Sequence, residues 1–189
     1  PVRTRIVSGL ADTFGRTIRD LRISITDRCN FRCLYCLPET EEAADFYRRQ
    51  SSTKPEPIRH EWKPRSHFLT YEEITRVVRI AVGQGVNKIR ITGGEPLLRR
   101  DVPNLVEQIA QHEGLKDLAL TTNGFHFAKH AEALRAAGLT RVTFSLDSLD
   151  PDNFKKLTGR DGLEELLAAI AQARELGFTP LKVNAVIIR

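Results

Sequence analysis

The sequence has no methionine, one tryptophan and only three cysteines among its 189 residues. No apolar run approaches the ~18 residues that a membrane-spanning helix requires. Residues 2–10 lack the apolar centre of a secretory signal peptide. We therefore expect a cytoplasmic protein without membrane contact, in a compartment that keeps thiols reduced. Because the chain begins at Pro1 and has no methionine, we expect a piece of a longer product.

Blocks of consecutive basic residues are also missing, although lysine and arginine outnumber the acids and give a net charge of +5. The basic residues form isolated pairs at 48–49, 99–100 and 155–156, a pattern typical of solvated surface. The excess charge is compatible with nucleic acid or with a small anion such as a nucleotide. A hydrophobic share of 41% is ordinary for a soluble domain with its own core.

The three cysteines are Cys29, Cys33 and Cys36, and three thiols so close together cannot pair as disulfides without one left over. They suit a metal ion or an iron–sulfur cluster. A four-iron cluster usually takes four thiolates, so three would leave one iron open to another molecule. The alternative is a zinc site of three cysteines and one histidine, with His60 or His67 as the fourth ligand.

Strand and helix patterns alternate along most of the chain. Strand patterns cover residues 21–26, 88–92, 117–120, 141–146 and 181–188. Helical patterns follow Thr70 and Asp101, and others cover residues 127–137 and 163–173. Strands separated by helices in this way pair in parallel through right-handed crossovers.

The faces of the strands distinguish an open doubly wound sheet from a barrel. Most of these strands alternate apolar and polar residues, whereas parallel strands covered on both faces are apolar throughout. We therefore predict an α/β fold, a partial (βα) barrel of parallel strands with a polar inner face, truncated after about five strands. We expect a cluster-binding strand and loop at 21–37, a long irregular insertion at 38–69, and βα repeats at 70–189.

Four unusual clusters follow the expected strands, where parallel α/β folds carry their functional groups. They are the cysteine segment, the segment Gly93-Gly94-Glu95-Pro96, residues 121–124 and residues 145–147. Glycines allow a ligand to approach the backbone closely, and Glu95 could accept an ammonium group. Taken alone, a plain turn with an exposed glutamate is the favoured interpretation of Gly93–Pro96, and a capped turn that of 121–124.

Three basic residues, Arg22, Arg90 and Lys182, fall on the polar faces of the strands. Cations that face an enclosed lumen are costly unless they meet an anion, and arginine suits phosphate through its forked guanidinium. The alternative is a solvated sheet edge or an ion pair with Asp147 or Glu95. The residues alone do not decide between these two interpretations.

The spacing Cys-x₃-Cys-x₂-Cys, with Tyr35 before the last cysteine and Thr92-Gly93-Gly94-Glu95-Pro96 downstream, resembles the radical S-adenosylmethionine (SAM) enzymes. Further segments are similar to the N-terminal portion of the GTP 3′,8-cyclase family of molybdenum cofactor biosynthesis. They are residues 15–16, 21–36, 88–101, 121–124, 145–147, 158–160 and 182–184. The resemblance spans nearly the whole chain.

This resemblance implies a lyase that binds a [4Fe-4S] cluster, SAM and GTP and has no catalytic side chain of its own. By resemblance, Cys29, Cys33 and Cys36 are the cluster ligands; Tyr35, Gly93, Gly94, Glu95 and Ser145 bind SAM; and Arg22, Arg90, Thr121 and Lys182 bind GTP. A radical formed from SAM would take hydrogen from C3′ of GTP, and the carbon radical would add to C8. The product is (8S)-3′,8-cyclo-7,8-dihydroguanosine 5′-triphosphate, on the way to cyclic pyranopterin monophosphate. The partners implied are GTP and a low-potential electron donor, with a homodimer as the possible assembly and no nucleic acid.

Relatives in this family carry a second [4Fe-4S] cluster in a C-terminal region, which this sequence lacks. We therefore expect the chain alone to lack a complete GTP site and to be inactive. Two alternatives stand beside this one. Another radical SAM enzyme, such as one that modifies peptides, would share the cysteines. A zinc-stabilised nucleic-acid-binding module would need a fourth ligand and a basic patch with stacking aromatic residues.

Overall fold

The computed structural model of the chain describes residues 9–36, 39–50 and 61–187. Its centre is a five-stranded sheet in which neighbours in sequence pair in parallel, in the order β1-β2-β3-β4-β5. The strands are β1 (Asp20–Ser24), β2 (Lys88–Thr92), β3 (Asp117–Thr122), β4 (Arg141–Ser145) and β5 (Leu181–Asn184). All five predicted strands are present, and β5 ends four residues earlier than the expected limit of 188.

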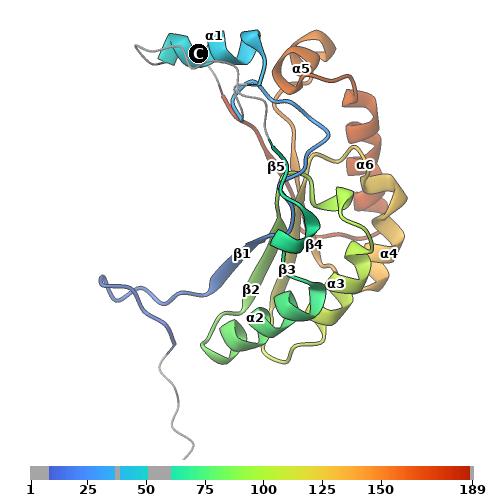
Figure 1. The fold of residues 1–189 in the computed structure, drawn as a ribbon. Coiled ribbons are helices and arrows are strands. Elements are labelled where there is room, and N and C mark those ends of the chain that lie inside the picture. Colours follow the sequence, from blue (N-terminus) through green and yellow to red (C-terminus); the bar gives the residue numbers. More distant parts are fainter. Residues whose placement is uncertain (1–8, 37–38, 51–60, 188–189) are drawn as a thin grey trace, which may run out of the picture.

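Helices connect the strands and cover one face of the sheet. They are α1 (Glu41–Gln50), α2 (Tyr71–Gly83), α3 (Val102–Ala110), α4 (Ala131–Ala136), α5 (Pro151–Thr158) and α6 (Leu163–Glu175), with short 3₁₀ turns η1 (Arg65–His67), η2 (Pro96–Leu98) and η3 (Phe127–Lys129). Figure 1 shows α2 to α6 along the outer side of a curved sheet and α1 at one end of it, beside α5, with which it lines one hollow. The predicted partial barrel of parallel strands is confirmed, and the sheet is not closed.

The apolar faces of the strands form the core against these helices. Ile91 of β2, Leu120 of β3 and Phe144 of β4 are fully buried, and they belong to one cluster with Leu105 of α3 and Leu166 of α6. Truncation of a buried phenylalanine such as Phe144 to alanine costs about 3–5 kcal/mol. This packing gives the loops at the carboxyl ends of the strands a rigid base.

Helix α2 begins as its sequence predicts, with the capping box of Thr70 and Glu73. The Glu73 N–H donates to Thr70 Oγ1 at 3.2 Å, and the Thr70 N–H donates to Glu73 Oε2 at 2.7 Å. Helix α5 was not predicted, although its signals are present. Asp150 accepts a hydrogen bond from the Asn153 N–H at 2.8 Å, and Pro151 occupies the first turn.

Two expectations need correction. The segment 38–69 is not irregular throughout, because it contains α1 and η1; Pro38 and residues 51–60 lie outside the described residues. Thr40 Oγ1 accepts a hydrogen bond from the Ala43 N–H at 3.2 Å at the start of α1. The single helix expected over 127–137 is divided into η3 and α4, and Phe127 of η3 is fully buried against Phe144.

None of the helices in the described part of the chain is both long enough and apolar enough to span a membrane. Strand β5 forms an edge of the sheet, and Val183 on its apolar face is 53% exposed. The apolar side chains of β5 are thus only partly covered by other described residues, although the strand alternates apolar and polar residues as predicted.

Candidate active site

The cysteine loop, residues 25–36, leaves the end of β1 and is held on both sides by backbone hydrogen bonds. The Ile25 N–H donates to the carbonyl of Thr92 at 2.9 Å, which continues the pairing of β1 with β2. The Arg32 N–H donates to the carbonyl of Thr158 at 2.8 Å. The loop is thus fixed between β2 and the end of α5.

All three cysteines are free thiols on this loop. Cys29 and Cys33 are half-buried, and Cys36 is exposed. The Cys36 N–H donates to the carbonyl of Cys33 at 2.9 Å, which closes a turn around Tyr35 and brings these two cysteines together. A neighbouring contact, the ion pair of Arg32 with Glu39 at 2.6 Å, ties the loop to the segment that leads into α1.

The thiols differ in acidity because of their surroundings. A hydrogen bond from the Cys33 thiol lowers the pKa of Cys36 to about 7, and the same bond raises the pKa of Cys33. Burial raises the pKa of Cys29. Since the thiolate is the form that binds metals, Cys36 is the cysteine most readily available to a metal at neutral pH.

The described part of the chain offers no site for a single metal ion. No group of three or more histidine, cysteine, aspartate or glutamate side chains converges there. His67 lies on η1 and joins no such group, and His60 lies outside the described residues. A zinc site with Cys₃His ligation requires that convergence, so the zinc-stabilised module gains no support.

The Gly93–Pro96 segment supports the cysteine loop directly. The Gly94 N–H donates to the carbonyl of Thr26 at 2.8 Å, and the Glu95 N–H donates to the carbonyl of Arg28 at 2.7 Å. A Cβ atom at Gly94 would lie 2.3 Å from the Arg28 oxygen, and one at Gly93 would lie 2.6 Å from the Thr26 oxygen. Both glycines are therefore required by the close approach of two loops of this chain.

Glu95 is completely buried, so the alternative of a plain turn with an exposed glutamate is wrong. Its Oε1 accepts hydrogen bonds from the Leu97 N–H at 3.0 Å and the Thr122 hydroxyl at 2.8 Å, and its Oε2 accepts one from the Asn123 N–H at 2.7 Å. Burial raises the pKa of Glu95, and the three hydrogen bonds oppose that shift. The carboxyl group joins the end of β2 to the end of β3, and its expected contact with SAM stays a prediction.

Asn123 continues this polar network to the cysteines. Its Oδ1 accepts a hydrogen bond from the Phe125 N–H at 3.1 Å. Its Nδ2 donates to Asn30 Oδ1 at 2.8 Å and lies 3.9 Å from Cys29 Sγ. Residues from the ends of β2 and β3 thus reach the first cysteine through one connected set of hydrogen bonds.

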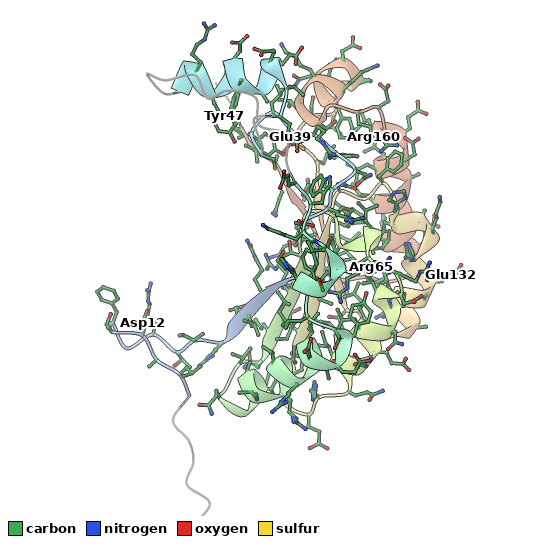
Figure 2. The ribbon with its side chains drawn as sticks, in the orientation of Figure 1. Asp12, Glu39, Tyr47, Arg65, Glu132 and Arg160 are labelled. Atoms are coloured by element: carbon green, nitrogen blue, oxygen red, sulfur yellow. The ribbon has the colours of Figure 1, made fainter. Side chains whose placement is uncertain are left out.

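Tyr35 is fixed on both of its polar sides. Its hydroxyl donates to Asp147 Oδ2 at 2.5 Å, just beyond the end of β4, and its carbonyl accepts a hydrogen bond from the Tyr47 hydroxyl at 2.7 Å. Figure 2 shows Tyr47 on α1, above the concave side of the sheet. Burial raises the pKa of Tyr35, so its hydroxyl remains a hydrogen-bond donor at neutral pH. Ser145 lies at the end of β4, opposite Asn184 in the register.

Arginines form a row on the concave face of the sheet. The register pairs Arg22 with Arg90, Arg90 with Ala119, and Ala119 with Arg141. The three arginines line a hollow of about 200 Å³. Arg141 is paired with Asp117 at 2.6 Å, whereas Arg22 and Arg90 have no ion pair among the described residues.

Lys182 belongs to the next row along the strands. It pairs in the register with Thr143, which pairs in turn with Thr121. The ion pairs considered as alternatives, with Asp147 or Glu95, are not formed among the described residues. Asp147 instead accepts one hydrogen bond from the Tyr35 hydroxyl and another from the Val186 N–H, two residues beyond β5, at 2.8 Å.

Comparison with known proteins places this arrangement in a family. The model of the radical SAM superfamily matches residues 23–189. The chain belongs to the radical SAM superfamily. It is 49% identical over 181 residues to the GTP 3′,8-cyclase of Acidothermus cellulolyticus, covering 95% of this chain and 46% of that protein. It is 45% identical over 179 residues to the GTP 3′,8-cyclase of Alkaliphilus metalliredigens, covering 95% of this chain and 50% of that protein.

Solved structures of the superfamily share the fold. SuiB of Streptococcus suis, bound to S-adenosylmethionine, has a TM-score of 0.68 and 21% identity, with 90% of this chain and 34% of that chain covered. Methylornithine synthase has a TM-score of 0.64 and 17% identity, with 90% and 45% covered. The chain spans about half the length of the curated relatives it matches.

The structure brings most of the predicted superfamily residues to the carboxyl ends of the strands, as expected. Sequence reasoning missed two side chains that hold them there, Asn123 and Asp147. Asn123 was passed over inside the segment 121–124, where only Thr121 was assigned. Asp147 was considered only as a partner for cations, although its Oδ2 accepts the hydrogen bond of the Tyr35 hydroxyl on the cysteine loop.

Proposed function

We propose that this chain is the cluster- and SAM-binding portion of a GTP 3′,8-cyclase, the enzyme that makes (8S)-3′,8-cyclo-7,8-dihydroguanosine 5′-triphosphate in molybdenum cofactor biosynthesis. The similarity to proteins of that name over 95% of the chain carries the proposal. The free arginines of the concave face agree with it, because a nucleoside triphosphate is a compact polyanion.

The cysteine loop carries the ligands for a [4Fe-4S] cluster. Cys29, Cys33 and Cys36 are free, partly accessible and close enough to influence one another's acidity, and three thiolates are one fewer than such a cluster usually takes. When bound, such a cluster supplies an open iron that chelates SAM and an electron that cleaves its sulfonium to give a 5′-deoxyadenosyl radical.

The side chains around that site would orient the two small molecules. Gly93 and Gly94 hold the cysteine loop in place by direct backbone contact, and Glu95, Tyr35 and Ser145 stand at the ends of the neighbouring strands. These five residues would face SAM from three segments: the cysteine loop, the Gly93–Pro96 segment and the end of β4. Their shared position supports the assignment more strongly than any of them taken singly.

The positive side chains of the concave face would bind the triphosphate of GTP. Arg22 and Arg90 are neighbours in the register, and neither forms an ion pair within the described part of the chain. Thr121 and Lys182 occupy the next row of the same face. Charge-assisted hydrogen bonds from arginine to phosphate are short and about twice as strong as neutral ones.

The chemistry also implies a partner and a setting. Reduction of the cluster requires a low-potential electron donor, and thiolates that must stay reduced suit the cytoplasm. Both belong to the proposal. Under it, the second cluster expected in the C-terminal half of relatives would complete the substrate site, as their greater length allows.

Replacement of Arg90 tests the substrate assignment. In the anaerobically reconstituted chain, we expect Arg90→Ala to weaken GTP binding by at least about tenfold, since a charge-assisted hydrogen bond contributes about 1.5–3 kcal/mol. SAM binding should stay unchanged. Arg79→Ala is the matched control, because Arg79 is exposed on α2, on the outer side of the sheet.

Titration calorimetry with GTP and with SAM gives both affinities on the same sample. Unchanged GTP binding in Arg90→Ala would remove the arginine row from the substrate site. Equal loss of GTP and SAM binding would show that Arg90 supports the fold of the site and does not contact the nucleotide.

A further inference from the structure

We propose that Asn123 is a positioning residue for the cluster: its side-chain amide donates a hydrogen bond to the Cys29 thiolate and raises the reduction potential of the cluster that the cysteines hold. This inference rests on the proposed function, since it assumes the cluster. It assigns a role to the residue of the segment 121–124 that faces the cysteine loop.

The orientation of the Asn123 amide is set by its neighbours. Its Oδ1 accepts the Phe125 N–H at 3.1 Å, so Nδ2 is the atom that points toward the cysteine loop. One hydrogen of Nδ2 is used by Asn30 Oδ1 at 2.8 Å, and Cys29 Sγ lies 3.9 Å from the same nitrogen. The side chain is only 8% exposed, so water does not compete for that second hydrogen.

The three cysteines are not equivalent in this respect. In the part of the chain that the structure describes, N–H groups reach a cysteine sulfur at Cys29 alone, from the Phe31 backbone at 3.4 Å and from Asn123. Asn30 Nδ2 is also buried beside this site and has no partner among the described residues. The site around Cys29 therefore holds three amide donors, from Phe31, Asn30 and Asn123, and the Asn30 donor has no acceptor within the described part of the chain.

The backbone of Asn123 is held by the buried carboxyl group of Glu95. Glu95 Oε2 accepts the Asn123 N–H at 2.7 Å, and the Thr122 hydroxyl that donates to Glu95 Oε1 also accepts the Gly124 N–H at 3.0 Å. Neighbours on both sides of Asn123 are thus fixed, which fixes the direction of its side chain. A rigid donor of this kind resembles the outer partners that orient and tune metal ligands.

Hydrogen bonds to cluster sulfurs are one of the factors that set the potential of iron–sulfur clusters. They stabilise the more negative, reduced form, because a partial positive charge then faces the thiolate. Glu95 acts in the opposite sense at Cys29, since its charge disfavours the thiolate there. Asn123, placed between Glu95 and Cys29, would offset that effect and make the cluster easier to reduce.

Two substitutions remove the donor in different ways. Asn123→Leu removes both amide hydrogens at similar size, and Asn123→Asp keeps the oxygen that accepts the Phe125 N–H while it replaces the donor with a carboxylate oxygen. Arg160→Ala is the matched control, because Arg160 donates to the Asn30 carbonyl at 3.2 Å and supports the same loop without touching a cysteine sulfur. Figure 2 shows Arg160 in the connection that follows α5.

The measurement is a redox titration of the reconstituted chain, followed by electron paramagnetic resonance (EPR), with iron content determined on each sample. At the wild-type midpoint, we expect the ratio of reduced to oxidised cluster to fall several-fold in Asn123→Leu and further in Asn123→Asp; a tenfold fall corresponds to about 59 mV for one electron. Arg160→Ala should keep the wild-type midpoint.

The outcomes separate this inference from the proposed function. A wild-type chain that takes up no four-iron cluster overturns both. A wild-type cluster whose midpoint is the same in both Asn123 variants overturns the role of Asn123 alone. An equal shift in Arg160→Ala also overturns it, because the effect would then come from loosening of the loop.

Discussion

Two loops at the same end of the sheet differ sharply in how they are held. In the Gly93–Pro96 segment, the two glycines pack against the backbone of residues 26–28, and the carboxyl group of Glu95 has no exposed surface. The cysteine loop beside it carries three free thiols, of which Cys36 is exposed. One loop has a buried carboxyl group whose two oxygens are both hydrogen-bonded within the chain, and the other leaves its thiols free and at least partly accessible.

This difference shows that two neighbouring segments share the work: the cysteine loop supplies the cluster ligands, and the Gly93–Pro96 segment holds that loop in its shape. The cysteine loop needs accessible thiolates, so it cannot bury them in a stable network of its own. Its shape comes instead from backbone contacts with Gly94 and Glu95 and from the side chains of Asn123 and Asp147. Substitutions in the supporting loop should therefore cost stability in the chain without its cluster, whereas substitutions of the ligands should not.

The largest effect is expected for Gly94→Ala. The added Cβ would lie 2.3 Å from the Arg28 oxygen and 2.6 Å from the Asp27 oxygen, so the two loops must separate. We expect a loss of about 3 kcal/mol in the free energy of unfolding, at the upper end for overpacking, together with poor iron uptake. Chemical denaturation of the cluster-free chain measures the first and iron analysis the second.

Gly83→Ala is the matched control for that substitution. A Cβ at Gly83 meets nothing within 4 Å, and the residue is helical at the end of α2. Alanine there should stabilise the chain by up to about 1 kcal/mol. If Gly94→Ala were as harmless as Gly83→Ala, the close contact between the two loops would not exist in solution.

Glu95→Gln should have the next largest effect. Both carboxylate oxygens accept hydrogen bonds, so at least one donor among Leu97, Thr122 and Asn123 loses its acceptor whichever way the amide turns. A buried donor without an acceptor costs about 1–3 kcal/mol, and we expect about 2 kcal/mol by denaturation. Glu113→Gln, at an exposed position, should change stability by less than about 0.5 kcal/mol. Equal behaviour of the two variants would contradict a supporting role for Glu95.

Tyr35→Phe should have a smaller effect on stability and a specific one on the cysteine loop. It removes the 2.5 Å hydrogen bond to Asp147, which we expect to lower the free energy of unfolding by about 1 kcal/mol and to slow iron uptake. Tyr71→Phe removes a comparable bond, from its hydroxyl to the Arg100 carbonyl at 2.6 Å, on the outer side of the sheet. The control should lose similar stability and keep normal iron uptake; slow uptake in both variants would count against a local effect.

The smallest change in stability is expected for Cys36→Ala. Its thiol is exposed, so the cluster-free chain should keep its free energy of unfolding to within about 0.5 kcal/mol. Iron uptake should nevertheless be lost. A large destabilisation measured without the cluster would show that the cysteine loop supports itself, and the division between the two loops would fail.

The acidity of Cys36 gives a further test on the same loop. Because its pKa is lowered to about 7, alkylation of the cluster-free chain should begin at this cysteine and speed up as the pH rises through about 7. Mass spectrometry of partly alkylated chain identifies the residue. Faster reaction at Cys29, whose pKa burial raises, would contradict the arrangement of the three thiols.

Local patterns predicted much of this fold and far less of the support of the site. Short strand patterns, most of them alternating, placed all five strands, and Thr70 with Glu73 placed the start of α2, because these signals act within a few neighbouring residues. Helix α1 was missed because the segment 38–69 was interpreted as irregular throughout, although Thr40 and the two glutamates that follow it are signals of a helix start. The contacts of Glu95 with Asn123 and of Tyr35 with Asp147 join residues 28 and 112 positions apart, so they depend on strand register that no local pattern shows.

The most direct test of the account is an EPR spectrum of the anaerobically reconstituted and reduced chain, recorded without and with SAM. We predict a [4Fe-4S] signal from a protein with about four irons per chain, and a changed signal when SAM binds the iron that no cysteine holds. A colourless protein with one zinc, or a cluster whose spectrum ignores SAM, would contradict the central claim.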